Sequence, residues 1–360
     1  MKKNISHKSA LQENEGVSQS EITDGLAINK LKHKRKSQPT AKDLISGICD
    51  NNITALSRAI TLVESKNPDH LKKATQIINA CLPKSNQSLR IGITGVPGVG
   101  KSTFIEALGM HLTAMGKKVA VLAVDPSSSL TKGSILGDKT RMEALVTHKN
   151  AYIRPSASGD SLGGVARKTR ETIILCEAAG FDTIIIETVG VGQSETAVHS
   201  MVDFFLLLKL AGAGDELQGI KRGIIEMADG IVINKADGNN LKRAQLAKTE
   251  FSRALHFYPV KASQWQPKVK LCSALKNEGI DTIWKMIEDF TSLTKSNGYF
   301  EQHRREQNKF WLLQTIEDQL KSNFFNQIQI KSELEKQLKL IAQNKTTPFA
   351  AAEYLLDLQQ

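Results

Sequence analysis

The sequence lacks the features that mark several large classes of protein. Only four of its 360 residues are cysteines, and no two of them stand at CxxC spacing. The most apolar run, residues 204–210, contains Lys209 and falls far short of the roughly 20 residues that a membrane helix needs. No apolar stretch follows the first lysines, so we expect no secretory signal, and the acidic residues near the start argue against a transit peptide. We therefore expect a cytoplasmic protein without disulfides and without a membrane partner.

The chain is basic, but the charge is concentrated only at its beginning. Lys and Arg number 48 against 37 Asp and Glu, a net charge of +11. Residues 1–40 carry eight basic and four acidic side chains, and aromatic residues make up only 5% of the chain. Nucleic-acid binders more often carry a basic stripe interleaved with aromatic residues. We expect a disordered basic tail over 1–40 and no nucleic-acid partner, with a binding module built on this tail as an open alternative.

Hydrophobic periodicity divides the rest of the chain into three parts. Residues 41–87 have a helical period with a break at Asn67-Pro68, which predicts an N-terminal helical segment whose second helix is Pro68–Cys81. Residues 88–290 alternate short apolar runs with longer helical patterns. The strands then stop, and residues 291–360 predict a C-terminal helical arm, with helix over 300–343.

The middle part predicts the fold class. Its apolar runs lack polar alternation, as strands do when both faces of a parallel sheet are covered. The spacers are long enough for crossover helices, so we predict an α/β fold with a mostly parallel, doubly wound sheet. The seven predicted strands are Arg90–Val96, Lys118–Val124, Ala151–Arg154, Asp182–Glu187, Phe204–Leu210, Gly230–Asn234 and Val269–Cys272.

A phosphate-binding loop follows the first predicted strand. Gly95–Ser102 satisfies the pattern G-x-x-x-x-G-K-[ST], and a helical pattern follows it. Glycines let the backbone N–H groups approach a phosphate chain, and the helix N-terminus adds its dipole. We expect Lys101 to reach the β- and γ-phosphates and Ser102 to bind Mg²⁺. The expected nucleotide contacts are Gly95, Val96, Pro97, Gly98, Val99, Gly100, Lys101, Ser102 and Thr103.

Two later segments predict that the base is guanine. Asn234-Lys235-Ala236-Asp237 follows a predicted strand, where the Asp237 carboxylate would accept from both N1–H and N2–H of guanine. Asn234 would contact the base edge or brace the loop, and the stem of Lys235 would cover the ring. The segment of Ser273, Ala274 and Leu275 follows the last strand, and a backbone N–H near Ala274 would donate to guanine O6.

Carboxylates at strand ends predict the metal and catalytic groups. Glu187 ends the strand that precedes Gly190, and a buried carboxylate there is costly unless it meets a cation, so we expect it to hold Mg²⁺ through water. The N–H of Gly190 is placed to sense the γ-phosphate. Asp125 and Asp138 are candidate Mg²⁺ ligands or water-positioning groups in a first switch. For orienting water, Asp125 ranks above Gln193, and the candidate arginine fingers are Arg141 and Arg154.

Together these segments resemble the methylmalonyl-CoA mutase-associated GTPases, the MeaB/ArgK family. The stretches that carry the resemblance include GSILGDKTRM at 133–142, LGGVARKTRE at 162–171 and ETVGVGQSE at 187–195. The resemblance is dense over residues 41–300 and loose over the C-terminal helices.

The resemblance implies a P-loop GTPase that uses GTP and Mg²⁺. Its partner would be an adenosylcobalamin-dependent acyl-CoA mutase, whose cofactor loading it gates and which it protects from inactivation. It would form a homodimer, partly through the C-terminal helical arm. The family's metal and switch roles fall on Ser102, Asp125, Asp138 and Glu187.

Two other functions stay open at this point. A kinase that passes the γ-phosphate to a protein or small molecule needs an acceptor site and a base, and the sequence offers no dedicated segment for either. A nickel-loading GTPase would share the nucleotide core, but the sequence lacks Cys/His ligand clusters.

Overall fold

The computed structural model describes residues 39–124, 142–155, 162–188, 194–212 and 222–358. The chain divides into two units, Met1–Thr40 and Ala41–Gln360. Nearly all of the first unit lies outside the described residues, so the disordered tail stays a prediction. In the described part, no helix combines the length and the apolar character needed to span a bilayer.

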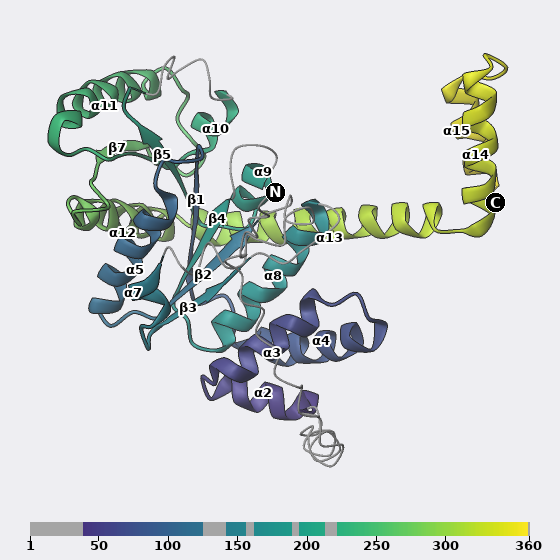
Figure 1. Ribbon diagram of the computed structural model, residues 1–360, viewed down its shortest axis with the longest axis horizontal. Coiled ribbons are helices and arrows are strands. Elements are labelled where there is room, and N and C mark those ends of the chain that lie inside the picture. Colours follow the sequence, from purple (N-terminus) through teal and green to yellow (C-terminus); the bar gives the residue numbers. More distant parts are fainter. Residues whose placement is uncertain (1–38, 125–141, 156–161, 189–193, 213–221, 359–360) are drawn as a thin grey trace, which may run out of the picture. The chain divides into compact units, whose positions relative to one another are not determined.

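A seven-stranded parallel sheet forms the centre of the second unit (Figure 1). The strand order is β3-β2-β4-β1-β5-β6-β7, and every neighbouring pair is parallel. The predicted α/β doubly wound fold is therefore confirmed, with each predicted strand present to within one residue. The strands are β1 (Leu89–Gly95), β2 (Val119–Val124), β3 (Ala151–Arg154), β4 (Thr183–Thr188), β5 (Phe204–Leu210), β6 (Gly230–Asn234) and β7 (Lys268–Leu271).

Helices cover both faces of the sheet, so inner strands such as β4 and β6 are buried along their whole length. One face packs on α5 (Lys101–Ala114), α7 (Glu143–Val146) and α12 (Ile280–Ser296). The other packs on α8 (Leu162–Ala178), α9 (Ser194–His199), α10 (Arg222–Met227) and α11 (Leu241–Leu255), with the short 3₁₀ turn η2 (Gly238–Asn240) before α11. Loops at the carboxyl ends of the strands are thereby held on a rigid base.

Three helices precede the sheet, where the helical period predicts two. They are α2 (Ala41–Cys49), α3 (Ile53–Glu64) and α4 (Pro68–Cys81), and the turn η1 (Leu82–Lys84) leads to β1. The unpredicted break falls at Asn51, whose φ of 59° ends α2 in a left-handed turn. Asn52 then caps α3, because its side chain accepts hydrogen bonds from the backbone N–H groups of Thr54 and Ala55.

The C-terminal segment is helical, as predicted, but the helix expected over 300–343 is two helices. They are α13 (Tyr299–Phe325) and α14 (Ile328–Ala342), followed by α15 (Pro348–Asp357). The break falls at Gln327, whose extended backbone stops the helical hydrogen bonding. Figure 1 shows α13 continuing beyond the sheet to α14, and α14 packs beside α15.

Candidate nucleotide-binding site

The loop after β1 has the backbone that the glycine pattern predicts. Gly98 has a φ of +80° and Gly100 a φ of +91°, a left-handed region that favours glycine. A Cβ at Gly98 would meet nothing within 4 Å, so the loop is open there. A Cβ at Gly100 would lie 2.9 Å from Nδ2 of Asn234, so any side chain there would displace that amide. Gly100 is thus required by both its conformation and its neighbour.

Helix α5 begins directly after this loop. Lys101, Ser102 and Thr103 form its first turn, where backbone N–H groups point outward and the helix dipole favours an anion. The Lys101 ammonium lies 2.8 Å from the carbonyl oxygen of Gly95, so the charge sits within the loop. The arrangement is suited to gripping a chain of phosphates.

Asn234 joins this loop to the segment that follows β7. It is 2% exposed at the end of β6. Its Nδ2 donates to the carbonyl oxygen of Val99 at 2.9 Å, and its Oδ1 accepts from the backbone N–H of Ala274 at 3.2 Å. The side chain therefore braces two loops, which is one of the two roles open to it from the sequence.

Lys235 and Asp237 lie on either side of the same junction. The Lys235 ammonium donates to the carbonyl oxygen of Gly98 at 3.0 Å, so its stem crosses from the β6 loop to the phosphate loop. The Asp237 carboxylate accepts from the hydroxyl of Ser273, which is 1% exposed. This bond fixes the carboxylate on the loop after β7.

Cys272 contributes to the brace, which the sequence did not indicate. Burial raises the pKa of its thiol to about 12, so it keeps its proton, and Sγ lies 3.3 Å from Oδ1 of Asn234 as a donor. By contrast, Leu275 exposes 82% of its side chain. Its predicted nucleotide contact stays a prediction.

Glu187 is placed on the face of the sheet that α5 covers. It lies in β4 opposite Ile93 of β1, it is 5% exposed, and Ile185 two residues earlier packs in the core beneath α5. Its carboxylate and the Ser102 hydroxyl are hard oxygen donors of the kind that Mg²⁺ prefers. The described donors thus fit a magnesium ion next to the phosphate loop.

Several predicted residues lie outside the described residues. They are Asp125, Asp138 and Gly190, together with Arg141 and Gln193. Arg154, a candidate arginine finger, is described: it ends β3 at the edge of the sheet, and its Nε donates to the carboxylate of Glu64 in α3 at 3.1 Å. Its charge serves the attachment of the N-terminal helices.

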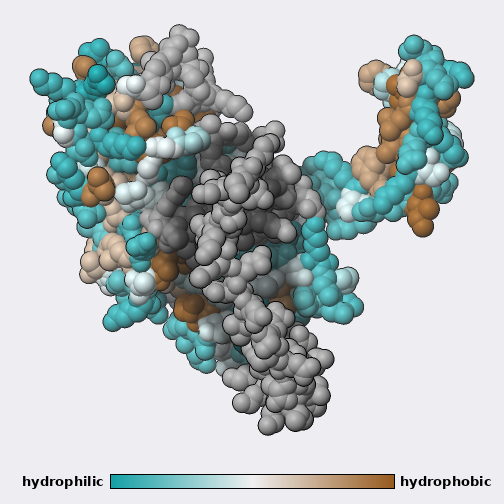
Figure 2. Space-filling model, viewed as in Figure 1, coloured by the Kyte–Doolittle hydropathy of each residue, from teal (hydrophilic) through white to brown (hydrophobic). Residues whose placement is uncertain are grey.

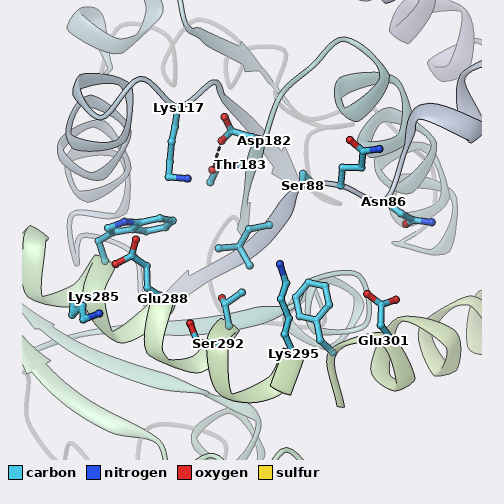
Figure 3. Close-up of a pocket in the computed structure, with 15 residues that line it drawn as sticks. Asn86, Ser88, Lys117, Asp182, Thr183, Lys285, Glu288, Ser292, Lys295 and Glu301 are labelled. Carbon is cyan, nitrogen blue, oxygen red and sulfur yellow. Dashed lines mark hydrogen bonds between the residues drawn. The ribbon is translucent and has the colours of Figure 1, made fainter. Parts of the chain in front are cut away.

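A separate cavity of about 630 Å³ lies at the amino ends of two inner strands, the end of the sheet opposite to the phosphate loop. It is lined by Leu89 and Thr183 at the amino ends of β1 and β4, and by α12. Figure 3 shows Lys117 and Lys295 extending into it from opposite walls. Its lining carries as many acidic as basic residues, so it has no excess positive charge for a triphosphate.

Comparison with known proteins gives consistent results. The family profile "Methylmalonyl Co-A mutase-associated GTPase MeaB" matches residues 56–329. The chain is 49% identical to a probable GTPase of Mycobacterium tuberculosis over 322 residues, which are 89% of this chain and 95% of the relative. It is 44% identical to GTPase ArgK of Escherichia coli over 324 residues, with 90% and 98% covered.

The similarity extends to an animal protein and to a solved structure. The chain is 41% identical over 331 residues to the mouse protein named methylmalonic aciduria type A homolog, mitochondrial, with 89% and 80% covered. The crystal structure of an LAO/AO transport system kinase is 39% identical, with a TM-score of 0.73 and coverage of 90% of this chain and 99% of that one.

Proposed function

The chain belongs to the family of methylmalonyl-CoA mutase-associated GTPases described as MeaB, and we propose that it acts as a GTP-driven chaperone of an adenosylcobalamin-dependent acyl-CoA mutase. In this role GTP binding and hydrolysis gate the loading of the mutase cofactor and protect the mutase. The proposal that this chain binds a nucleotide rests on the two hydrogen bonds of Asn234, to Val99 and to Ala274. They join the loop that would hold the phosphates to the loop that would contact the base.

The proposed site divides its contacts between phosphate and base. Residues 95–103 hold the phosphates, with the ammonium of Lys101 next to the β- and γ-phosphates. Asp237 accepts from N1–H and N2–H of guanine, and Ala274 donates to O6. The hydroxyl of Ser273 supports this arrangement, because it holds the Asp237 carboxylate by a hydrogen bond.

The proposed metal ligands are Ser102 and, through water, Glu187, with Asp125 and Asp138 from the first switch. A magnesium ion there supplies positive charge to the β- and γ-phosphate oxygens. Lys101 neutralises charge on the same oxygens, and Asp125 orients the attacking water. Positioning and charge neutralisation are all that a phosphoryl transfer of this type asks of the protein.

The proposed assembly is a homodimer joined partly through α13, α14 and α15. Apolar side chains support this proposal, because they line these helices without being buried by the rest of the chain. Figure 2 shows hydrophobic residues along α14 and α15. Those more than half exposed on the three helices are Leu312, Leu313, Leu320, Ile328, Leu338, Phe349 and Leu356.

Changing Asp237 tests the base assignment. In Asp237→Asn an amide N–H₂ donor takes the place of a carboxylate acceptor. Guanine loses a hydrogen bond, because its 2-amino group is itself a donor, whereas the 2-oxo group of xanthine can accept from the amide. We expect calorimetry to show GTP affinity lower by at least about tenfold and XTP affinity higher. Glu250→Gln, an exposed change on α11, should leave both affinities unchanged. Equal affinity of the unaltered protein for ATP and GTP would reject the assignment.

The mutase role is tested by single-turnover hydrolysis of GTP labelled at the γ-phosphate. We expect slow release of inorganic phosphate from the protein alone and faster release when a cobalamin-dependent acyl-CoA mutase is added. Rates that do not change with the mutase would reject the partner. Label recovered on a protein or small molecule, rather than as inorganic phosphate, would favour the kinase alternative, which is the activity that the solved relative's name carries.

A further inference from the structure

Asn240 stands at the N-cap position of α11 but does not cap the helix. Its backbone is helical, with φ −87° and ψ −12°, and its side chain makes no capping hydrogen bond. Instead Nδ2 donates to the carbonyl oxygen of Lys235, five residues earlier, at 2.8 Å. A residue whose type suggests a helix start therefore has a different partner.

That partner lies in a strained piece of backbone. Lys235 has a φ of +57°, which long side chains rarely adopt. The residues on both sides of Lys235 are fixed by hydrogen bonds, which restricts its backbone. Asn234 is bonded to Val99 and Ala274. The N–H of Ala236 donates to the carbonyl oxygen of Cys272 at 2.9 Å. The hydrogen bond from Asn240 stabilises this conformation at the carbonyl that follows the strained φ.

Asn240 also holds the other end of the same turn. Its backbone N–H donates to the carbonyl oxygen of Asp237 at 3.0 Å. Residues 235–237 are thus enclosed between two hydrogen bonds from a single residue. The direction in which the Asp237 carboxylate leaves the chain depends on this closed turn.

We propose that Asn240 is a positioning residue for guanine specificity: through Lys235 it sets the Asp237 carboxylate against the 2-amino group of the base. The inference rests on the proposed function. It adds a residue that touches neither the base nor the phosphates. Because the phosphate loop has its own bonds to Asn234 and Lys235, Asn240 acts on base discrimination more than on the grip of the phosphates.

Comparison of GTP with ITP isolates this contribution, because inosine lacks only the 2-amino group. In Asn240→Ala we expect the ratio of GTP affinity to ITP affinity to fall about fivefold or more by calorimetry. Asn239→Ala is the matched control, since Asn239 is exposed and its side chain makes no hydrogen bond within the described part of the chain.

Asn240→Asp separates this role from helix capping. Aspartate has the same shape and is a good N-cap residue, but its carboxylate cannot donate to the Lys235 carbonyl. We expect the GTP-to-ITP ratio to fall as far as in Asn240→Ala. A ratio kept in Asn240→Asp, or equal losses for GTP and ITP in either variant, would overturn the inference alone. An unaltered protein that binds ATP as tightly as GTP would overturn the proposed function and the inference with it.

Discussion

His199, the last residue of α9, illustrates how burial changes the chemistry of one residue. Its ring meets Phe205 edge-on, with centroids 5.4 Å apart, and lies 6.3 Å from the ring of His303. Burial lowers its pKa to about 4, and the nearby Lys261 and His303 add to the effect while Asp229 opposes it. The imidazole is therefore neutral in the folded protein at neutral pH.

The depressed pKa of His199 predicts a loss of stability in acid. The unfolded chain binds a proton near pH 6.5 and the folded chain only near pH 4, so this contribution is present above pH 6.5 and falls as the pH drops towards 4. The total is on the order of 3 kcal/mol. Urea unfolding of His199→Phe at pH 7.5 and 5 should show a smaller loss than the unaltered protein. His256→Phe, at an exposed position, should keep the full loss; the same loss in both variants would contradict the assignment.

For single residues, the sequence predicts which side chains belong to the nucleotide site better than it predicts which atoms they hydrogen-bond. The phosphate loop was predictable because its glycines permit the left-handed backbone that Gly98 and Gly100 adopt, and Lys101 follows them at the start of α5. The bracing by Asn234 was one of two readings, and the structure decides it through Val99 and Ala274. Asn240 was missed, because an asparagine before a helical pattern is typical of a cap. Only the φ of Lys235 and the position of its carbonyl reveal the other role.

Helix α13 is attached to the sheet through a buried ion pair at its first turns. Arg304, 6% exposed, donates from Nε to the Asp203 carboxylate at 2.8 Å. The same guanidinium donates to the carbonyl oxygens of Asn86 and Ser88. These bonds join α13 to the segments that enter β1 and β5. The attachment satisfies every charge it buries, which is the condition for a buried ion pair to be tolerated.

Removing the arginine predicts a large loss of stability. Arg304→Met leaves the Asp203 carboxylate buried without its partner, which typically costs about 3–5 kcal/mol. Urea unfolding should report this as a lower midpoint with an unchanged slope. Arg305→Met, the exposed neighbour on the same helix, should change the unfolding free energy by no more than about 0.5 kcal/mol. A loss for Arg304→Met as small as that of the control would contradict the role of the ion pair.

Helices and strands were predictable where the hydrophobic pattern continues without a break. The ends of helices were not predicted where a single residue interrupts the helix. The strands follow from uninterrupted apolar runs. The break between α2 and α3 depends on the left-handed conformation of Asn51, and the break before α14 on the extended backbone of Gln327. Asp50-Asn51-Asn52 is a cluster of residues that favour turns and so carried a local signal for the first break, whereas Gln327 is not a turn-forming residue and carried none.

At the scale of the whole molecule, α13 carries a row of exposed apolar side chains. Leu312, Ile316 and Leu320 recur every four residues, so they lie on one face, and each is between 47% and 62% exposed. A stripe of this kind is costly in water and typical of an interface between helices. It supports the proposed homodimer.

Charged substitutions on this stripe should separate the subunits. In Leu312→Glu/Leu320→Glu, like charges and lost apolar contact oppose association, and we expect the dimer dissociation constant to rise at least about tenfold. Size-exclusion chromatography with light scattering measures the change, and Lys309→Glu serves as the charge control on the same helix. A monomeric unaltered protein at micromolar concentration would contradict the proposed dimer.

The first half of α13 holds three of the four residues of one connection: Trp311 donates to the carbonyl oxygen of Ser200, Gln307 to that of Val202, and Arg304 to the Asp203 carboxylate. That connection is the whole link between the end of α9 and the start of β5. The base of α13 is therefore fastened to the segment that leads into β5, the strand that pairs with β1 just before the phosphate loop. A partner bound at the far end of α13 would thus hold the same continuous helix, Tyr299–Phe325, whose base is bonded to the entrance of β5.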